Sequence, residues 1–307
     1  MTILAALAPV FVAIFAGWAA RFSKLVPESA WAGVSKATYM ILSPVFIFGE
    51  IVRADLALDD LAFVAAGVAG FSTAALLGFL LWPVSAGDRP AFASAHQGVV
   101  RWNTFVILAA AAALFGTEGA ALIALLLGPV IPLINSITVT VHARYGHAQN
   151  PSLQGVLRSL ATNPLILACV AGLAVNLSGV RLPAPVEDSV AIIGRGALGV
   201  SLMCVGAGLD LKAVSARPAL MAAAVALKLA VVPLVFIGFG LLAGLDGVRL
   251  ACLALIGAAP SPPAAYVLTR EMGGDPRFMA GHITATTLLA ALSLPLALAL
   301  AQALAPS

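Results

Sequence analysis

Ten long apolar segments dominate the sequence, and short connections that hold most of the charged and turn-forming residues separate them. A helix that crosses about 30 Å of hydrocarbon needs roughly 20 apolar residues, and each segment reaches or approaches that length. We therefore predict an all-α polytopic membrane protein with ten transmembrane helices. The predicted spans are residues 3–21, 31–52, 61–84, 91–115, 118–142, 161–179, 188–208, 217–243, 248–269 and 277–303.

The composition supports a membrane protein. Apolar residues make up 62% of the chain and charged residues only 9%, whereas soluble domains have about 45–50% and about 25%. These values exclude a disordered chain, a disulfide scaffold and an ordinary soluble enzyme. The sixteen Lys and Arg residues form no dense run with interleaved aromatics, so we expect no nucleic-acid partner. The three cysteines lie in apolar stretches and are typical of buried hydrophobes, and we expect no resident cofactor or metal.

The distribution of cations between alternate loops predicts the orientation, because cytoplasmic loops carry an excess of Lys and Arg. Ten cations lie on the side of the odd-numbered loops, and only Arg53, Arg181 and Arg249 lie on the other. We expect a multi-pass protein of the cell inner membrane with the odd-numbered loops in the cytoplasm. An even number of spans then places both termini outside, on the periplasmic side.

Two halves of similar organisation meet at the loop around residues 146–154. Each half has five predicted spans, and an odd number means that similar halves insert with opposite orientations, as in many secondary transporters. We therefore predict two inverted five-helix repeats, residues 1–150 and 151–307. An offset of 157 positions relates the ends of spans 2 and 7 and carries Asn103 in span 4 to Pro260 in span 9.

Spans 4 and 9 hold the candidate binding site. Span 4 contains the polar cluster Gln97-Gly98-Val99-Val100-Arg101-Trp102-Asn103-Thr104, and span 9 contains Pro260-Ser261-Pro262-Pro263. Three prolines in four residues cannot continue a helix, and Asn103 and Ser261 are typical N-cap residues for a second half-helix. Two half-helix N-termini meeting in the membrane attract an anion. Gln97, Arg101, Asn103, Thr104, Pro260 and Ser261 are therefore candidate substrate-binding residues.

Further polar residues lie within the spans. Three cations, Arg101, Arg195 and Lys228, have no Asp or Glu at a similar depth, and such costly charges are usually functional or paired. Arg101 and Lys228 are candidate substrate ligands, whereas Arg195 has either a functional or a packing role. Asn135 either lines the polar interior or bonds between helices. His282 is the candidate for ion coupling, and His96 is expected at the interface.

Several motifs resemble the auxin efflux carrier family, which includes the plant PIN-formed auxin exporters and bacterial permeases. The likeness is carried by Asn103-Thr104-Phe105-Val106, Asn163-Pro164, Gly206-Ala207-Gly208-Leu209-Asp210, Pro260 through Glu271, and Thr286-Thr287-Leu288-Leu289 to Leu294-Pro295. The resemblance implies that helices 1, 2, 6 and 7 form a scaffold that dimerises. Helices 3–5 and 8–10 would form a mobile transport unit in which helices 4 and 9 cross at the substrate, with Asn103 and Pro260 at the crossover.

The chain departs from the plant carriers in two ways. Trp102 stands where they have a proline, and the long central cytoplasmic loop is missing. The resemblance to bacterial members therefore implies an elevator-type secondary transporter of small carboxylates such as malonate or malate, and not an auxin carrier.

Three alternatives remain. A sodium-coupled bile-acid-type organic anion symporter shares the crossed-helix plan, and coupling to Na⁺ or H⁺ stays open. A membrane-embedded enzyme lacks support, because the chain has no H-E-x-x-H motif and no convincing Ser–His pairing. A sensor without transport activity would bind a ligand but show no flux.

Overall fold

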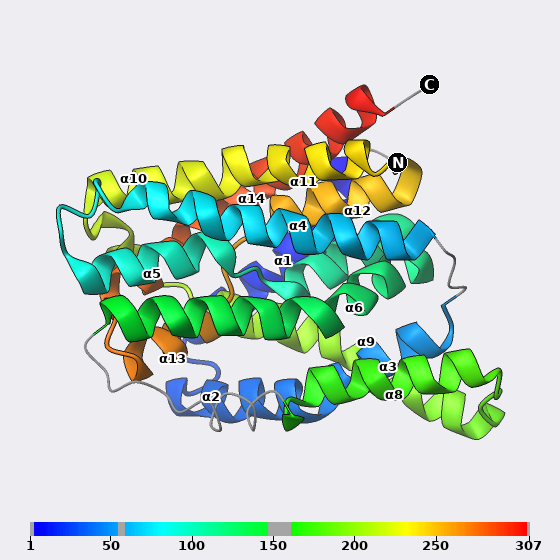
Figure 1. The fold of residues 1–307 in the computed structure, drawn as a ribbon. Coiled ribbons are helices and arrows are strands. Elements are labelled where there is room, and N and C mark those ends of the chain that lie inside the picture. Colours follow the sequence, from blue (N-terminus) through cyan, green and yellow to red (C-terminus); the bar gives the residue numbers. More distant parts are fainter. Residues whose placement is uncertain (1–2, 55–58, 147–160, 306–307) are drawn as a thin grey trace. The chain divides into compact units, whose positions relative to one another are not determined.

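The computed structural model describes residues 3–54, 59–146 and 161–305 (Figure 1). These residues form helices and turns and contain no strand, which confirms the prediction of an all-helical fold. Most of the predicted central loop, residues 147–154, lies outside the described residues. The helices are α1 (Ile3–Phe22), α2 (Glu28–Ala37), η1 (Thr38–Leu42), α3 (Ser43–Val52), α4 (Asp59–Gly78), η2 (Phe79–Leu81), α5 (Arg89–Val100), α6 (Thr104–Tyr145), α8 (Pro164–Ser178), α9 (Ala184–Ala207), η3 (Leu211–Ser215), α10 (Pro218–Ala226), η4 (Leu227–Val231), α11 (Val232–Leu242), α12 (Gly247–Gly257), α13 (Ala264–Glu271) and α14 (Pro276–Leu304).

Seven helical stretches within the described ranges are long and apolar enough to cross a membrane. Six correspond to predicted spans 1, 2, 3, 7, 8 and 10. The seventh, Arg89–Tyr145, covers predicted spans 4 and 5 together, and the remaining two spans contain the shorter apolar helices Pro164–Ser178 and Gly247–Gly257. Length and apolar composition therefore support a multi-pass membrane protein.

A kink in α6 explains why spans 4 and 5 run together. Gly116 has φ 60° and ψ −143°, so the helical direction changes there without a loop. A positive φ at this position suits glycine, which has no Cβ to clash with the backbone. The predicted boundary between residues 115 and 118 falls at this glycine.

The chain forms two compact units. Unit 1 contains the described parts of residues 1–57, 105–128 and 157–208, and unit 2 contains those of residues 58–104, 129–156 and 209–307. Helix α6 contributes to both, because residues 105–128 belong to unit 1 whereas Thr104 and the residues from Pro129 onward belong to unit 2.

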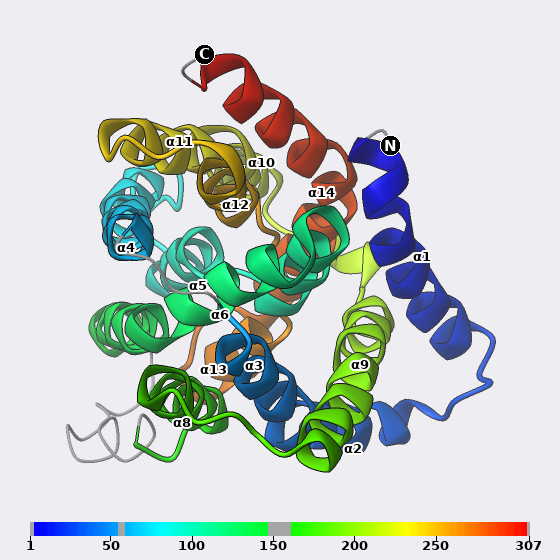
Figure 2. The same ribbon diagram turned by 90° about the vertical axis from the view of Figure 1, so that its right-hand side faces the viewer.

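Unit 1 depends on close packing of α1 against α9, which lie side by side in Figure 2. Two glycines allow this approach, because a Cβ on Gly17 would overlap the carbonyl of Met203 and one on Gly206 would overlap the carbonyl of Ile14. The Arg21 guanidinium donates to the carbonyl of Ala207 at the end of α9 (2.6 Å). Small residues at such interfaces let helix backbones pack in direct contact.

Two groups of ion pairs join helix starts within unit 2. Arg217, just before α10, binds Asp88 before α5 (2.5 Å) and Asp275 before α14 (2.8 Å). The hydrogen bond that Arg217 donates to Asp275 raises the pKa of the Arg217 guanidinium. Arg249 in the first turn of α12 binds Asp60 in the first turn of α4 (2.9 Å). Both aspartates that face Arg217 also cap their own helices through backbone N–H groups.

We expect Gly206→Ala to lower the thermal stability of the purified protein. The added methyl group has no room beside Ile14, and overpacking of this kind costs about 1–3 kcal/mol. Gly199→Ala in the same helix is the matched control, because a Cβ there meets no atom within 4 Å. Thermal unfolding in detergent measures both variants, and equal melting temperatures would contradict the close α1–α9 contact.

We expect charge exchange to rescue the ion pair between Asp60 and Arg249. The single variant Arg249→Asp destabilises unit 2, because the carboxylate of Asp60, which is 6% exposed, then faces a second carboxylate. The double variant Asp60→Arg with Arg249→Asp restores stability, with a coupling of about 0.5–3 kcal/mol. The same exchange between Asp88 and Arg217 gives a smaller coupling, since that pair is more exposed. Additive effects of the single variants at Asp60 and Arg249 would contradict this assignment.

Candidate functional site

The interruption in predicted span 4 lies between two helices. Asp88 starts α5 by accepting a hydrogen bond from the N–H of Ala91 (3.0 Å). The helix ends at Val100, where Arg101 turns into extended backbone (φ −74°, ψ 146°), and α6 starts at Thr104. Trp102 and Asn103, which lie between the helices, are 5% and 0% exposed. A buried, non-helical backbone segment therefore lies within the polar cluster of predicted span 4.

A second interruption follows α12, which ends at Gly257, and α13 starts at Ala264. The prolines between them cannot supply the N–H groups that a continuous helix needs. The prediction that Ser261 caps the second half-helix is wrong, because Pro263 occupies the N-cap position. The Ser261 side chain instead donates a hydrogen bond to the carbonyl of Gly98 in α5.

The two interruptions contact each other within unit 2. The backbone N–H of Asn103 donates to the carbonyl of Pro260 (2.7 Å). The Gln97 amide reaches across in the same way and donates through Nε2 to the carbonyl of Ala265 (2.8 Å). Gln97, Asn103 and Pro260 are all buried. The structure thus brings together these sequence-predicted site residues from segments more than 150 positions apart.

The last carbonyls of α5 need hydrogen-bond donors, because no following helical turn supplies them. Ser261 Oγ donates to the carbonyl of Gly98 (2.7 Å), and Lys228 Nζ donates to the carbonyl of Val99 (3.0 Å). Lys228 is 1% exposed and lies in the π-helical turn η4 of span 8. A cation at a helix C-terminus also interacts favourably with the helix dipole. Lys228 and Ser261 therefore hold the end of α5.

Helix α14 adds a polar wall beside Ser261. Thr286 Oγ1 accepts a hydrogen bond from the Ser261 N–H (3.1 Å), and His282 Nδ1 lies 3.2 Å from Ser261 Oγ. Two buried atoms, Gln97 Oε1 and Thr287 Oγ1, have no hydrogen-bond partner within the described part of the chain. Buried polar atoms without partners are rare in proteins, and these two belong to α5 and α14.

Arg101 turns toward the last part of α6. Its guanidinium donates to Asn135 Oδ1 (2.6 Å) and lies 3.4 Å from Thr138 Oγ1. Arg101 and Asn135 are half-buried, whereas Thr138 is buried. Asn135 therefore forms a hydrogen bond between two segments and orients Arg101. This favours the interpretation that Asn135 bonds between helices.

Two histidines differ from the sequence-based expectation. His96 was expected at the interface but is 0% exposed, because its ring packs between Phe79 and Phe92 and its Nε2 bonds to the carbonyl of Ala75 (2.9 Å). His142 was not identified from the sequence, yet it is equally buried and its Nδ1 bonds to the carbonyl of Thr138 (2.9 Å). A histidine near the end of a predicted span carries no signal of such burial.

The remaining predicted residues are more peripheral to this hydrogen-bond network. Thr104 begins α6 and is half-buried. The side chain of Arg195 lies outside what the structure describes. Among the described residues, no group of three or more His, Cys, Asp or Glu side chains is arranged to hold a metal ion.

A comparison with family sequence models gives one match. The family described as membrane transport protein matches residues 135–298. This stretch is more than half of the chain and includes Asn135, Lys228, Pro260, Ser261 and His282. No curated protein matches the chain.

We expect Lys228→Met to destabilise the protein in the absence of any substrate. The variant leaves the buried carbonyl of Val99 without its donor, at a cost of about 1–3 kcal/mol. Lys212→Met is the control, because Lys212 is exposed in the same unit. A lysine that only binds substrate would leave the melting temperature of the ligand-free protein unchanged, and that result would contradict the structural role.

Proposed function

Since the chain belongs to the membrane transport protein family, to which the auxin efflux carriers belong, we propose that it is a secondary transporter of small organic anions. The proposed substrates are carboxylates such as malonate or malate. The proposed site is the crossover of the two interruptions in unit 2, with Gln97, Arg101, Asn103, Thr104, Pro260 and Ser261 nearest to the substrate. Lys228 and Asn135 support these residues from behind.

The contact between Asn103 and Pro260 carries this proposal. It holds together two segments after which helices begin, α6 at Thr104 and α13 at Ala264. The first N–H groups of a helix have no partner within it, and the helix dipole makes this end electropositive. Two such ends, with the half-buried Arg101 guanidinium beside one of them, favour a small anion as the substrate.

The ion pairs support the proposed inverted repeats of ten helices. The offset of 157 positions that relates Asn103 to Pro260 also relates Asp60 to Arg217. Asp60 binds Arg249 at the start of α12, and Arg217 binds Asp88 at the start of α5. Each pair therefore joins the start of the third predicted helix of one half to the start of the fourth predicted helix of the other half. The acidic and the basic residue exchange places between the two pairs. Residues 1–150 and 151–307 are accordingly the two proposed repeats.

We assign the transport step to an elevator-type movement of unit 2 against unit 1. The support is that the hydrogen bonds of the crossover lie within unit 2 and that unit 1 contains predicted helices 1, 2, 6 and 7, together with residues 105–128 of α6. In this proposal unit 1 is the scaffold and forms a homodimer in the bilayer of the inner membrane, with both termini on the periplasmic side.

Ion coupling has two candidates. His282 is a proton carrier in the first, because its fully buried ring places Nδ1 3.2 Å from Ser261 Oγ at the crossover. In the second, Na⁺ binds to hydroxyl and carbonyl oxygens near Ser261, Thr286 and Thr287, as in a sodium-coupled bile-acid-type symporter. Dependence of the flux on sodium or on pH separates them. Catalysis is not proposed, because the match is to a family of transporters.

Flux measurements with Asn103→Ala test the site. A thermal-shift screen of mono- and dicarboxylates first selects a substrate, and uptake of that substrate is then followed in proteoliposomes. The variant retains the backbone bond to Pro260 and so the crossing, but it removes the side chain next to the helix start. We expect flux to fall to background while the melting temperature changes little.

Thr140→Ala is the matched control, because Thr140 lies in unit 2 and is exposed. In the described part of the chain its hydroxyl bonds only within its own helix, to the carbonyl of Ser136 (2.7 Å). Its flux should equal that of the wild type. Normal flux in Asn103→Ala would place the substrate elsewhere, and ligand binding without any flux in the wild type would indicate a sensor.

A further inference from the structure

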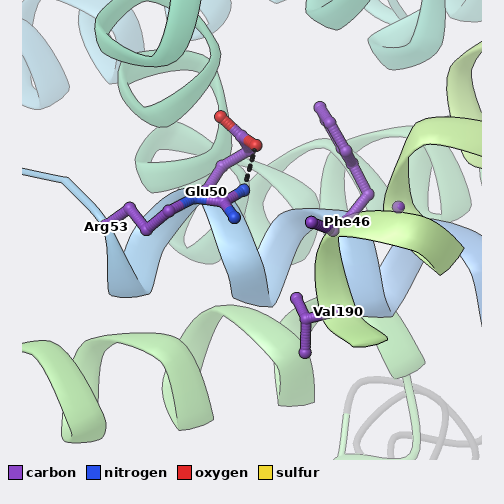
Figure 3. Close-up of a pocket in the computed structure, with 6 residues that line it drawn as sticks. Phe46, Glu50, Arg53 and Val190 are labelled. Atoms are coloured by element: carbon purple, nitrogen blue, oxygen red, sulfur yellow. Dashed lines mark hydrogen bonds and ion pairs between the residues drawn. The ribbon is translucent and has the colours of Figure 1, made fainter. Parts of the chain in front are cut away.

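A cavity of about 270 Å³ lies in unit 1 between α3 and α9 (Figure 3). It is lined by Phe46, Glu50, Arg53, Val190, Ala191 and Gly194. The close approach of the two helices shapes its floor, because a Cβ on Gly194 would come within 3.2 Å of Phe46 Cα. The cavity is therefore a feature of one compact unit.

The cavity has a charged end and an apolar end. Arg53 Nη2 donates to Glu50 Oε1 at 2.7 Å, and the two side chains are 36% and 9% exposed. Phe46, Val190 and Ala191 supply apolar walls toward the other end. Figure 3 shows Arg53, Glu50 and Phe46 in this order along α3, with Val190 on the facing helix.

The order of the charged and the apolar end of the cavity agrees with the expected depth of each in the bilayer. Arg53 directly follows Val52, the last residue of α3 and of predicted span 2, so it lies at the membrane surface. Phe46 lies seven residues earlier, which is about 10 Å deeper at about 1.5 Å per residue. The charged end therefore lies at headgroup depth and the apolar end at the depth of the glycerol and the first acyl carbons.

Arg53 is not needed to satisfy the end of α3. Asn176 of α8 places its Nδ2 2.7–3.2 Å from the carbonyls of Ile51, Val52 and Ala54. The guanidinium instead donates to Glu50 and lines the cavity. A carboxylate of this low exposure repels an anion, and the guanidinium repels a cation, so the pair favours a ligand of zero net charge that carries both signs.

We propose that this cavity binds a zwitterionic phospholipid with a primary ammonium group, phosphatidylethanolamine, from the periplasmic leaflet. The ammonium donates hydrogen bonds to Glu50, the phosphate accepts them from Arg53, and the start of an acyl chain lies against Phe46 and Val190. A choline headgroup cannot donate hydrogen bonds to Glu50, and a glycerol headgroup leaves the lipid with a net negative charge. The cavity therefore prefers phosphatidylethanolamine over both.

Native mass spectrometry of the full-length protein tests this preference. The protein in detergent is titrated separately with phosphatidylethanolamine, phosphatidylcholine and phosphatidylglycerol of identical acyl chains. We expect phosphatidylethanolamine adducts to form at about fivefold lower lipid concentration than the other two. The variants Arg53→Gln and Glu50→Gln should remove this difference, whereas Arg181→Gln, which changes an exposed cation on the same side, should preserve it.

A further variant distinguishes loss of lipid binding from misfolding of the charge variants. Ala191→Phe fills the cavity from α9 and leaves both charges in place. It should also remove the preference, with the melting temperature of each variant showing that it is folded. Equal binding of the three lipids to the wild type, stronger binding of phosphatidylglycerol, or an unchanged preference in Ala191→Phe would each overturn the proposal.

Discussion

The carbonyl groups at the end of α5 impose the main constraint on unit 2. They lie among buried side chains, where an unbonded carbonyl is costly. Ser261 and Lys228 reach the carbonyls of Gly98 and Val99 from two other spans, and the Arg101 N–H bonds that of Gln97. This requirement explains a lysine that is 1% exposed and a buried serine whose hydroxyl donates to the carbonyl of a distant helix. An interrupted helix is stable here because distant segments complete its hydrogen bonds.

The same chemistry recurs where other cations contact helix ends and starts. Arg21 donates to the carbonyl of Ala207 at the end of α9, and Arg217 and Arg249 bind carboxylates at helix starts. Backbone carbonyls therefore hold Arg21 and Lys228, and carboxylates hold Arg217 and Arg249, so the charges of these four cations are less available to a substrate. The positive charge of the proposed site then depends on the helix starts and on Arg101 more than on Lys228.

The sequence predicts the position of helices and of their interruptions, because these depend on local properties. Apolar length marks the spans, including the boundary between residues 115 and 118, and the prolines around Ser261 mark the second interruption. It does not predict the partners, because these come from residues more than 100 positions away. The bonds of Ser261 to Gly98 and of Lys228 to Val99, and the burial of His96, are set by packing between spans. For that reason the sequence suggests Ser261 as the N-cap of the following helix, whereas Pro263 occupies that position.

The location of these bonds bears on how a proposed elevator can move. A transport step that separated α5 from η4 or α14 would leave several buried polar groups without partners, each at about 1–3 kcal/mol. Those bonds lie inside unit 2, as do the ion pairs of Arg217 and Arg249, so movement of unit 2 as a body preserves them. Rocking of one repeat against the other would break them, because they join residues on both sides of the central loop. The hydrogen-bond pattern therefore favours movement of a unit that combines helices from both halves.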